Sequence, residues 1–73
     1  NTADEAYMNM GLAYAYMKNY DQAFYNLNIA TQLNPGNWQA YQIIGAIYQQ
    51  KGDAQTAQQY FNQASAVKQQ LGQ

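Results

Sequence analysis

The sequence contains no cysteine and no histidine, and both absences narrow the range of functions. Without cysteine there is no disulfide and no thiolate metal site. Without histidine the chain lacks the commonest general base and the commonest neutral metal ligand. Arginine is missing too, and three lysines against four acidic residues give a net charge of −1. Because so few positive charges cannot neutralise a row of phosphates, we expect no nucleic-acid partner.

Long apolar runs are also missing. No stretch approaches the roughly 20 apolar residues of a membrane span, so we expect no membrane insertion. Only 10% of the residues are charged, whereas the chain has 8 Asn, 13 Gln, eight tyrosines and 48% hydrophobic residues. The apolar and aromatic content favours a folded domain over a disordered amide-rich tract. This composition suits the cytoplasm and a bacterial periplasmic or secreted location equally well.

An internal repeat of 34 residues runs through the chain. Within residues 4–71, identical residues coincide on this shift at seven positions: Ala6 and Ala40, Tyr7 and Tyr41, Gly11 and Gly45, Tyr14 and Tyr48, Ala23 and Ala57, Asn28 and Asn62, and Ala30 and Ala64. Because repeats of this length are units of helical arrays, we treat residues 1–73 as one domain of two units, about 4–37 and about 38–71.

Each unit is predicted to contain two helices. Thr2 and Glu5 have the spacing of a capping box, and apolar residues then recur every three or four positions as far as Met17. Asp21 is the predicted N-cap of a second helix, which should end before Pro35.

The second unit repeats this order. Asn37 is the predicted cap of a third helix and Asp53 that of a fourth, with a turn at 51–53 between them. The fourth helix should continue to about Gln70, with Gly72 as its stop signal. The sequence therefore predicts an all-α fold of two antiparallel helical hairpins.

The residue types at these positions resemble the tetratricopeptide repeat, whose pattern is W-x2-L-G-x2-Y followed by A-x3-F and P. The first unit reads Tyr7-x2-Met10-Gly11-x2-Tyr14, Ala23-x3-Leu27 and Pro35; the second reads Tyr41-x2-Ile44-Gly45-x2-Tyr48 and Ala57-x3-Phe61. The resemblance implies a short right-handed α-solenoid that acts as a noncatalytic protein-interaction scaffold. We expect Gly11 and Gly45 to lie where the two helices of each hairpin cross.

Catalysis is not expected. Asp21 and Asp53 are assigned to helix starts, while the adjacent Asp4 and Glu5 point to different sides of a first turn. Ser65 has no base to activate it, and the chain has no glycine-rich phosphate loop. We therefore expect no enzyme, no cofactor and no metal.

The resemblance also implies a concave groove, lined by the first helix of each unit, that holds a peptide or partner protein. On this chain the groove residues would be Glu5, Met8, Asn9, Leu12 and Tyr16 from the first unit and Gln39, Gln42, Ala46, Gln49 and Gln50 from the second. Met8, Leu12 and Tyr16 are predicted to carry binding, with amides supplying hydrogen bonds. In the alternative interpretation these three are exposed, or are covered by an upstream helix of a parent protein.

Met8 and Leu12 stand where family members that clamp a C-terminal carboxylate have lysine and asparagine, so that activity is not expected. A second surface is the far side of the fourth helix, where Phe61, Ala64, Val67 and Leu71 would face a further repeat. Either further helices of a parent protein cover these residues, or a homodimer buries them, which is the alternative function. In a third interpretation the long fourth helix and its Gln-rich end (Gln69, Gln70 and Gln73) themselves cap the repeat array.

Overall fold

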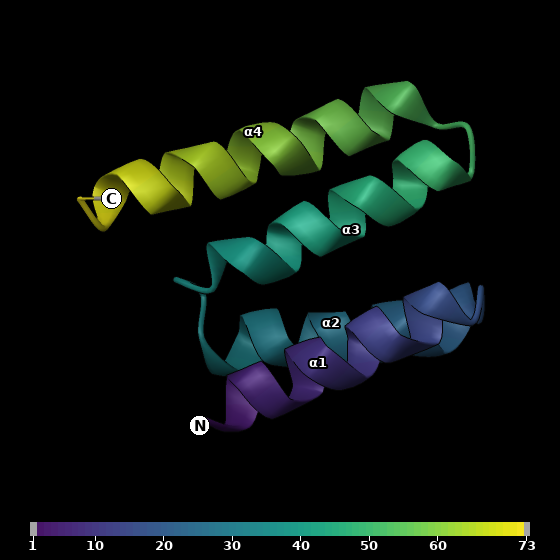
Figure 1. Cartoon of the computed structure of the whole chain (residues 1–73). Helices are drawn as coiled ribbons and strands as arrows, with labels where there is room; N and C mark the ends of the chain where they lie inside the picture. Colours follow the sequence, from purple (N-terminus) through teal and green to yellow (C-terminus); the bar gives the residue numbers. More distant parts are fainter. Residues whose placement is uncertain (1, 73) are drawn as a thin grey trace.

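The computed structural model describes residues 2–72 and contains four helices within them (Figure 1). These are α1 (Ala3–Tyr16), α2 (Tyr20–Leu33), α3 (Trp38–Gln50) and α4 (Ala54–Gln70). α1 packs against α2 and α3 against α4, so each pair is a hairpin, and α3 also contacts both helices of the first hairpin. The predicted all-α fold is confirmed; Gln73, part of the predicted cap, lies outside the described residues.

Three of the four predicted helix starts are confirmed. Thr2 and Glu5 form the capping box of α1, in which the Glu5 carboxylate accepts from the Thr2 amide at 3.0 Å. The side chains of Asn37 and Asp53 accept from amides three residues later, at the starts of α3 and α4. The Asp21 cap was wrong, because α2 begins at Tyr20 and its N-cap position is occupied by Asn19.

The turns that close the two hairpins are the same Schellman motif. In the first, Asn19 N donates to Tyr14 O at 2.9 Å; in the second, Asp53 N donates to Tyr48 O, also at 2.9 Å. The residue before each donor adopts the left-handed conformation, with φ of 62° at Lys18 and 86° at Gly52. Within residues 2–72, Lys18 is the one non-glycine residue with positive φ. The first turn thus places a lysine where the second has glycine.

Replacing Lys18 with glycine should raise the free energy of unfolding by about 0.5–1 kcal/mol. A side chain in the left-handed region costs about 1–2 kcal/mol, of which the greater unfolded-state freedom of glycine cancels part. Chemical denaturation of Lys18→Gly tests this, with the reciprocal substitution Gly52→Lys in the second turn as the control. Equal stability of all three proteins would contradict the expectation, since Gly52→Lys should lose what Lys18→Gly gains.

Glycine allows close approach at the crossing point of each hairpin, as predicted. A Cβ built on Gly11 would lie 2.6 Å from Leu27 Cγ and 3.1 Å from Ala23 O. A Cβ on Gly45 would lie 2.8 Å from the Phe61 ring and 3.1 Å from Ala57 O. The four contact residues are themselves related by the 34-residue shift, so both hairpins pack by the same geometry.

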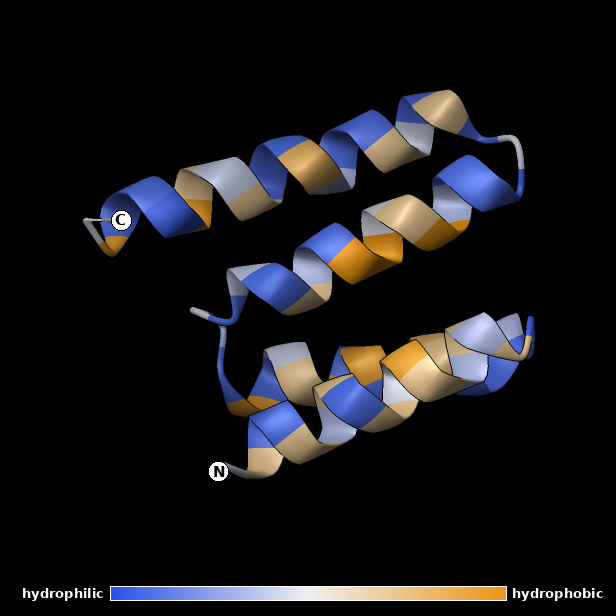
Figure 2. Ribbon diagram, viewed as in Figure 1, coloured by the Kyte–Doolittle hydropathy of each residue, from blue (hydrophilic) through white to orange (hydrophobic). Residues whose placement is uncertain are grey.

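One continuous core joins the two hairpins. Its buried members are Ala23, Leu27, Ala30, Ala40, Ile44 and Ile47, contributed by α2 and α3. Figure 2 shows the strongly hydrophobic parts of α3 on the side towards the first hairpin. The aromatic rings of Phe24 and Tyr48 extend this core with centroids 5.0 Å apart, and Tyr60 stacks on Tyr48 at 5.6 Å. The second hairpin is therefore held to the first by apolar packing.

Candidate binding groove

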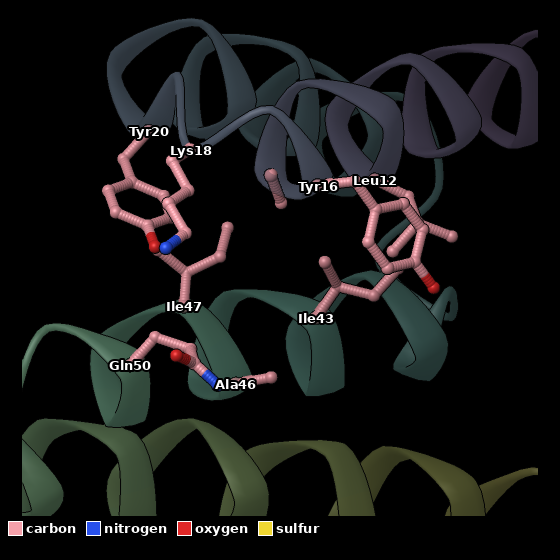
Figure 3. Close-up of a pocket in the computed structure, with 9 residues that line it drawn as sticks. Leu12, Tyr16, Lys18, Tyr20, Ile43, Ala46, Ile47 and Gln50 are labelled. Carbon is pink, nitrogen blue, oxygen red and sulfur yellow. The ribbon is translucent and has the colours of Figure 1, made fainter.

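A cavity of about 370 Å³ lies between α1 and α3, towards the turn that ends α1 (Figure 3). Leu12, Ala15, Tyr16, Lys18, Tyr20, Ile43, Ala46, Ile47 and Gln50 line it. Figure 3 shows Leu12 and Tyr16 of the first hairpin lying over Ile43 of α3, and Lys18 and Tyr20 lying over Ile47. Its volume is within the range of about 300–1,000 Å³ that ligand pockets occupy.

The walls of this cavity are mostly apolar, and they differ in how firmly they are fixed. Ile47 is buried in the core, Ile43 and Tyr20 are half-buried against it, and Leu12 is half-buried. By contrast, Tyr16 is 80% exposed and stands at the edge. A fixed apolar floor with exposed polar ends can hold an apolar side chain and hydrogen-bond the backbone beside it.

Four of the ten predicted groove residues line this cavity: Leu12, Tyr16, Ala46 and Gln50. Glu5 and Gln39 line a second cavity instead, at the other end of α1. The exposed residues Asn9, Gln42 and Gln49 are not among the described lining residues of either cavity. Met8 is not among those lining residues either; it is half-buried and packs against the core.

Five lining residues were not predicted from the sequence: Ala15, Lys18, Tyr20, Ile43 and Ile47. Ile43 adjoins Ile44, so the apolar surface of α3 is wider than the single stripe that packs inside its hairpin. The Ile43–Ile44 pair could have indicated this wider surface from the sequence. The first unit has the polar Asn9 at the position equivalent to Ile43, so the comparison of the two units did not draw attention to it. The sequence does not indicate that Lys18 and Tyr20 line the cavity, because helical periodicity does not predict the direction of side chains in or beside a turn.

The second cavity, of about 280 Å³, contains a polar junction between the two units. The buried Asp4 carboxylate accepts from the Asn37 side-chain amide at 2.9 Å and from that of Asn34 at 3.2 Å. Asn37 Oδ1 meanwhile caps α3. In the second unit the residues equivalent to Asp4 and Asn34 are Trp38 and Lys68, and the Lys68 ammonium lies 4.6 Å from the Trp38 ring centroid. The same two positions are therefore in contact in both units. The contact is a hydrogen bond between Asp4 and Asn34 in the first unit and a cation–π contact between Lys68 and Trp38 in the second.

Hydrogen bonding stabilises the charged form of Asp4. Its bond with the Thr2 side chain, and then those with Asn34 and Asn37, hold the pKa of Asp4 below its usual range against the opposing effect of burial. The pKa of Glu5 is lowered by the Thr2 backbone amide, and that of Asp53 by Thr56. Asp4 is thus a structural carboxylate that fixes the junction.

The lowered pKa values set the expected pH dependence of stability. A carboxylate whose pKa is lower in the folded state stabilises the fold above its usual pKa, and this contribution is lost as the pH falls through the folded-state value. The free energy of unfolding should therefore be level between about pH 7 and 5 and fall below about pH 4. Urea titrations across this range measure the loss, which should be smaller in Asp4→Asn. An identical acid loss in Asp4→Asn would contradict the assignment.

The predicted far face of α4 is largely used within its own hairpin. Ala64 is 2% exposed, and the Phe61 ring packs at the Gly45 backbone. Val67 is half-buried, and of the four residues only Leu71, at 52%, belongs to the exposed class in the described chain. The prediction of a bare apolar stripe was therefore wrong: the three- and four-residue steps mark the face that α4 turns towards α3.

Residues 2–72 hold no group of three or more acidic, cysteine or histidine side chains that could bind a metal. No helix of the described chain combines the length and apolar character that crossing a membrane requires.

Comparison with known proteins identifies the family. Models of the tetratricopeptide repeat match residues 4–37 and 39–71, in agreement with the two predicted units. The chain belongs to the tetratricopeptide repeat family. A search of curated protein sequences finds no match.

Among solved structures, the chain is similar to a crystal structure of MamA. The TM-score is 0.89 and the sequence identity 31% over 96% of this chain. The match covers 41% of the MamA chain, so this chain spans less than half the length of that relative. The tetratricopeptide fold, a short α-solenoid, is thereby confirmed, and repeats of this family generally mediate protein–protein interactions and are typically noncatalytic.

Proposed function

We propose that the chain is a protein-interaction module that binds a peptide segment of a partner protein in the cavity between α1 and α3. The observation that carries this proposal is the apolar cavity formed by Leu12 and Tyr16 on one side and Ile43 and Ile47 on the other. Family membership supports it, because repeat arrays use their concave surface for binding.

The cavity favours an extended or helical peptide with one apolar anchor. Its apolar floor is contributed by both units, so the site exists only when the hairpins are stacked. The exposed Tyr16 hydroxyl and the Gln50 amide lie at the edge and can hydrogen-bond the peptide backbone. Hydrophobic burial then supplies affinity, and the polar edge fixes the orientation of the peptide.

Replacing Leu12 with lysine should weaken peptide binding at least tenfold. The change removes an apolar wall and places a charge that an apolar anchor would have to desolvate. Isothermal titration calorimetry with a peptide selected on the wild-type chain measures the effect. Circular dichroism should show unchanged helicity, because Leu12 is only half-buried.

A matched control is Leu33→Lys, in which an exposed leucine at the end of α2 is replaced by the same residue. This variant should bind as the wild type does. Unchanged affinity in Leu12→Lys, or an equal loss in Leu33→Lys, would contradict the proposed site.

Self-association through α4 is the less favoured function. The packing of Phe61 and Ala64 against α3 leaves little of the predicted contact face available. A dimer through α4 would have to rest mainly on Leu71 and the edge of Val67.

A further inference from the structure

We infer that the groove prefers peptides that have an acidic side chain next to the apolar anchor, and that the Lys18 ammonium binds the acidic residue. This inference rests on the proposed function and names the chemistry of the partner: an apolar residue for the cavity, followed by an aspartate or glutamate at the end of α1. The partner is thus an acidic, amphipathic segment of another protein.

Charge is the first observation behind this inference. Of the nine residues that line the cavity, all of them in the described chain, Lys18 is the one that carries a charge. Its side chain lies beside the Tyr20 hydroxyl over the floor of the cavity (Figure 3). A second ammonium, that of Lys51, lies 5.9 Å from the Tyr20 ring centroid.

The acidic residues are placed differently. Asp4 and Glu5 line the second cavity at the opposite end of α1, and Asp53 caps α4. Asp21, on the first turn of α2, is exposed and is not among the residues described as lining the cavity. Among the described lining residues, the charge in the first cavity is therefore the positive charge of Lys18, whereas the second cavity is lined by Asp4 and Glu5. A peptide carboxylate is favoured beside Lys18 and opposed beside Asp4 and Glu5.

The conformation of Lys18 is the second, independent observation. The Schellman turn requires a left-handed residue, and the equivalent turn of the second unit satisfies this with glycine. At Gly52 there are no atoms within 4 Å of a built Cβ, so space does not decide which residue is used. A strained residue at the edge of a binding cavity is a recognised mark of function. Here the chain has a strained lysine, and its positive charge lies at the groove. A glycine at this position would relieve the strain but would remove the charge.

A peptide selection tests the inference on the 73-residue chain. A random-peptide display library is panned in parallel on the wild type, Lys18→Gly and Lys68→Gln, where the last removes the same charge beside Trp38, outside the cavity. Wild-type and Lys68→Gln selections should be enriched in aspartate or glutamate next to an apolar residue. The Lys18→Gly selection should keep the apolar residue and lose the acidic preference.

Affinity measurements on one selected peptide complete the test. Its binding should weaken about two- to fivefold in Lys18→Gly, as expected for an exposed charge pair. The same peptide with its acidic residue replaced by the corresponding amide should bind both proteins alike. Because glycine also relieves strain in the turn, a loss of binding by this variant cannot be attributed to unfolding.

Two results would overturn the inference, and they have different meanings. If selected peptides depend on Leu12 but show no acidic preference, or lose equal affinity in Lys68→Gln, the inference fails and the proposed function stands. If no selected peptide binds above background, or all bind Leu12→Lys as well as the wild type, both fail.

Discussion

Replacing Leu27 with alanine should lower the free energy of unfolding by about 2–5 kcal/mol, enough to unfold a large fraction of so small a domain. Leu27 is 0% exposed and is the largest fully buried side chain of the described residues. It fills the space between Gly11 and the shared core, so its removal leaves a cavity that the backbone of α1 cannot fill. Urea denaturation followed by circular dichroism measures the loss.

The control for this variant is Leu33→Ala on the same helix. Leu33 is 54% exposed, so its truncation should cost well under about 1 kcal/mol. Similar losses in the two variants would mean that Leu27 is not the centre of the core.

Gly11→Val should destabilise the chain by about 1–3 kcal/mol. Even the Cβ of valine would overlap the Leu27 side chain, and the two methyl groups would force α1 away from α2. Better helix propensity offsets only a fraction of this cost, because glycine and valine differ by less than about 1 kcal/mol. Denaturant titrations of Gly11→Val and of Ala13→Val, an exposed position of the same helix, separate overpacking from propensity.

The double variant Gly11→Val/Leu27→Ala sharpens this experiment. Because alanine at 27 vacates the space that valine at 11 would enter, the double variant should lose less stability than the sum of the two single losses. Strict additivity would contradict direct contact between the two positions.

Much of the fold could be predicted because the same signals occur twice. The 34-residue repeat indicated four helices, and Asn37, Asp53 and Pro35 marked boundaries that the structure confirms. The Asp21 cap was wrong because local residue type was given more weight than the geometry of the preceding turn. The Schellman motif ends α1 with Lys18 and Asn19, and α2 starts directly after it.

The candidate site was harder to predict because its residues are shared between elements. Leu12 and Tyr16 were predicted as groove residues, and both line the cavity. Met8, another predicted groove residue, packs against the core, because the first unit contacts α3 as well as α2, which widens the buried face of α1. The bond between Asp4 and Asn37 joins residues 33 positions apart, and no local pattern indicates such a contact.

The central claim, that partners bind between α1 and α3, is tested most directly by methyl NMR. Isoleucine, leucine and valine methyl groups are labelled, and a selected peptide is titrated into the chain. We expect the resonances of Leu12, Ile43 and Ile47 to shift, while those of Leu33, Val67 and Leu71 stay in place. Shifts at Val67 and Leu71 with unchanged resonances at Leu12 and Ile43 would contradict the account and move the binding site to α4.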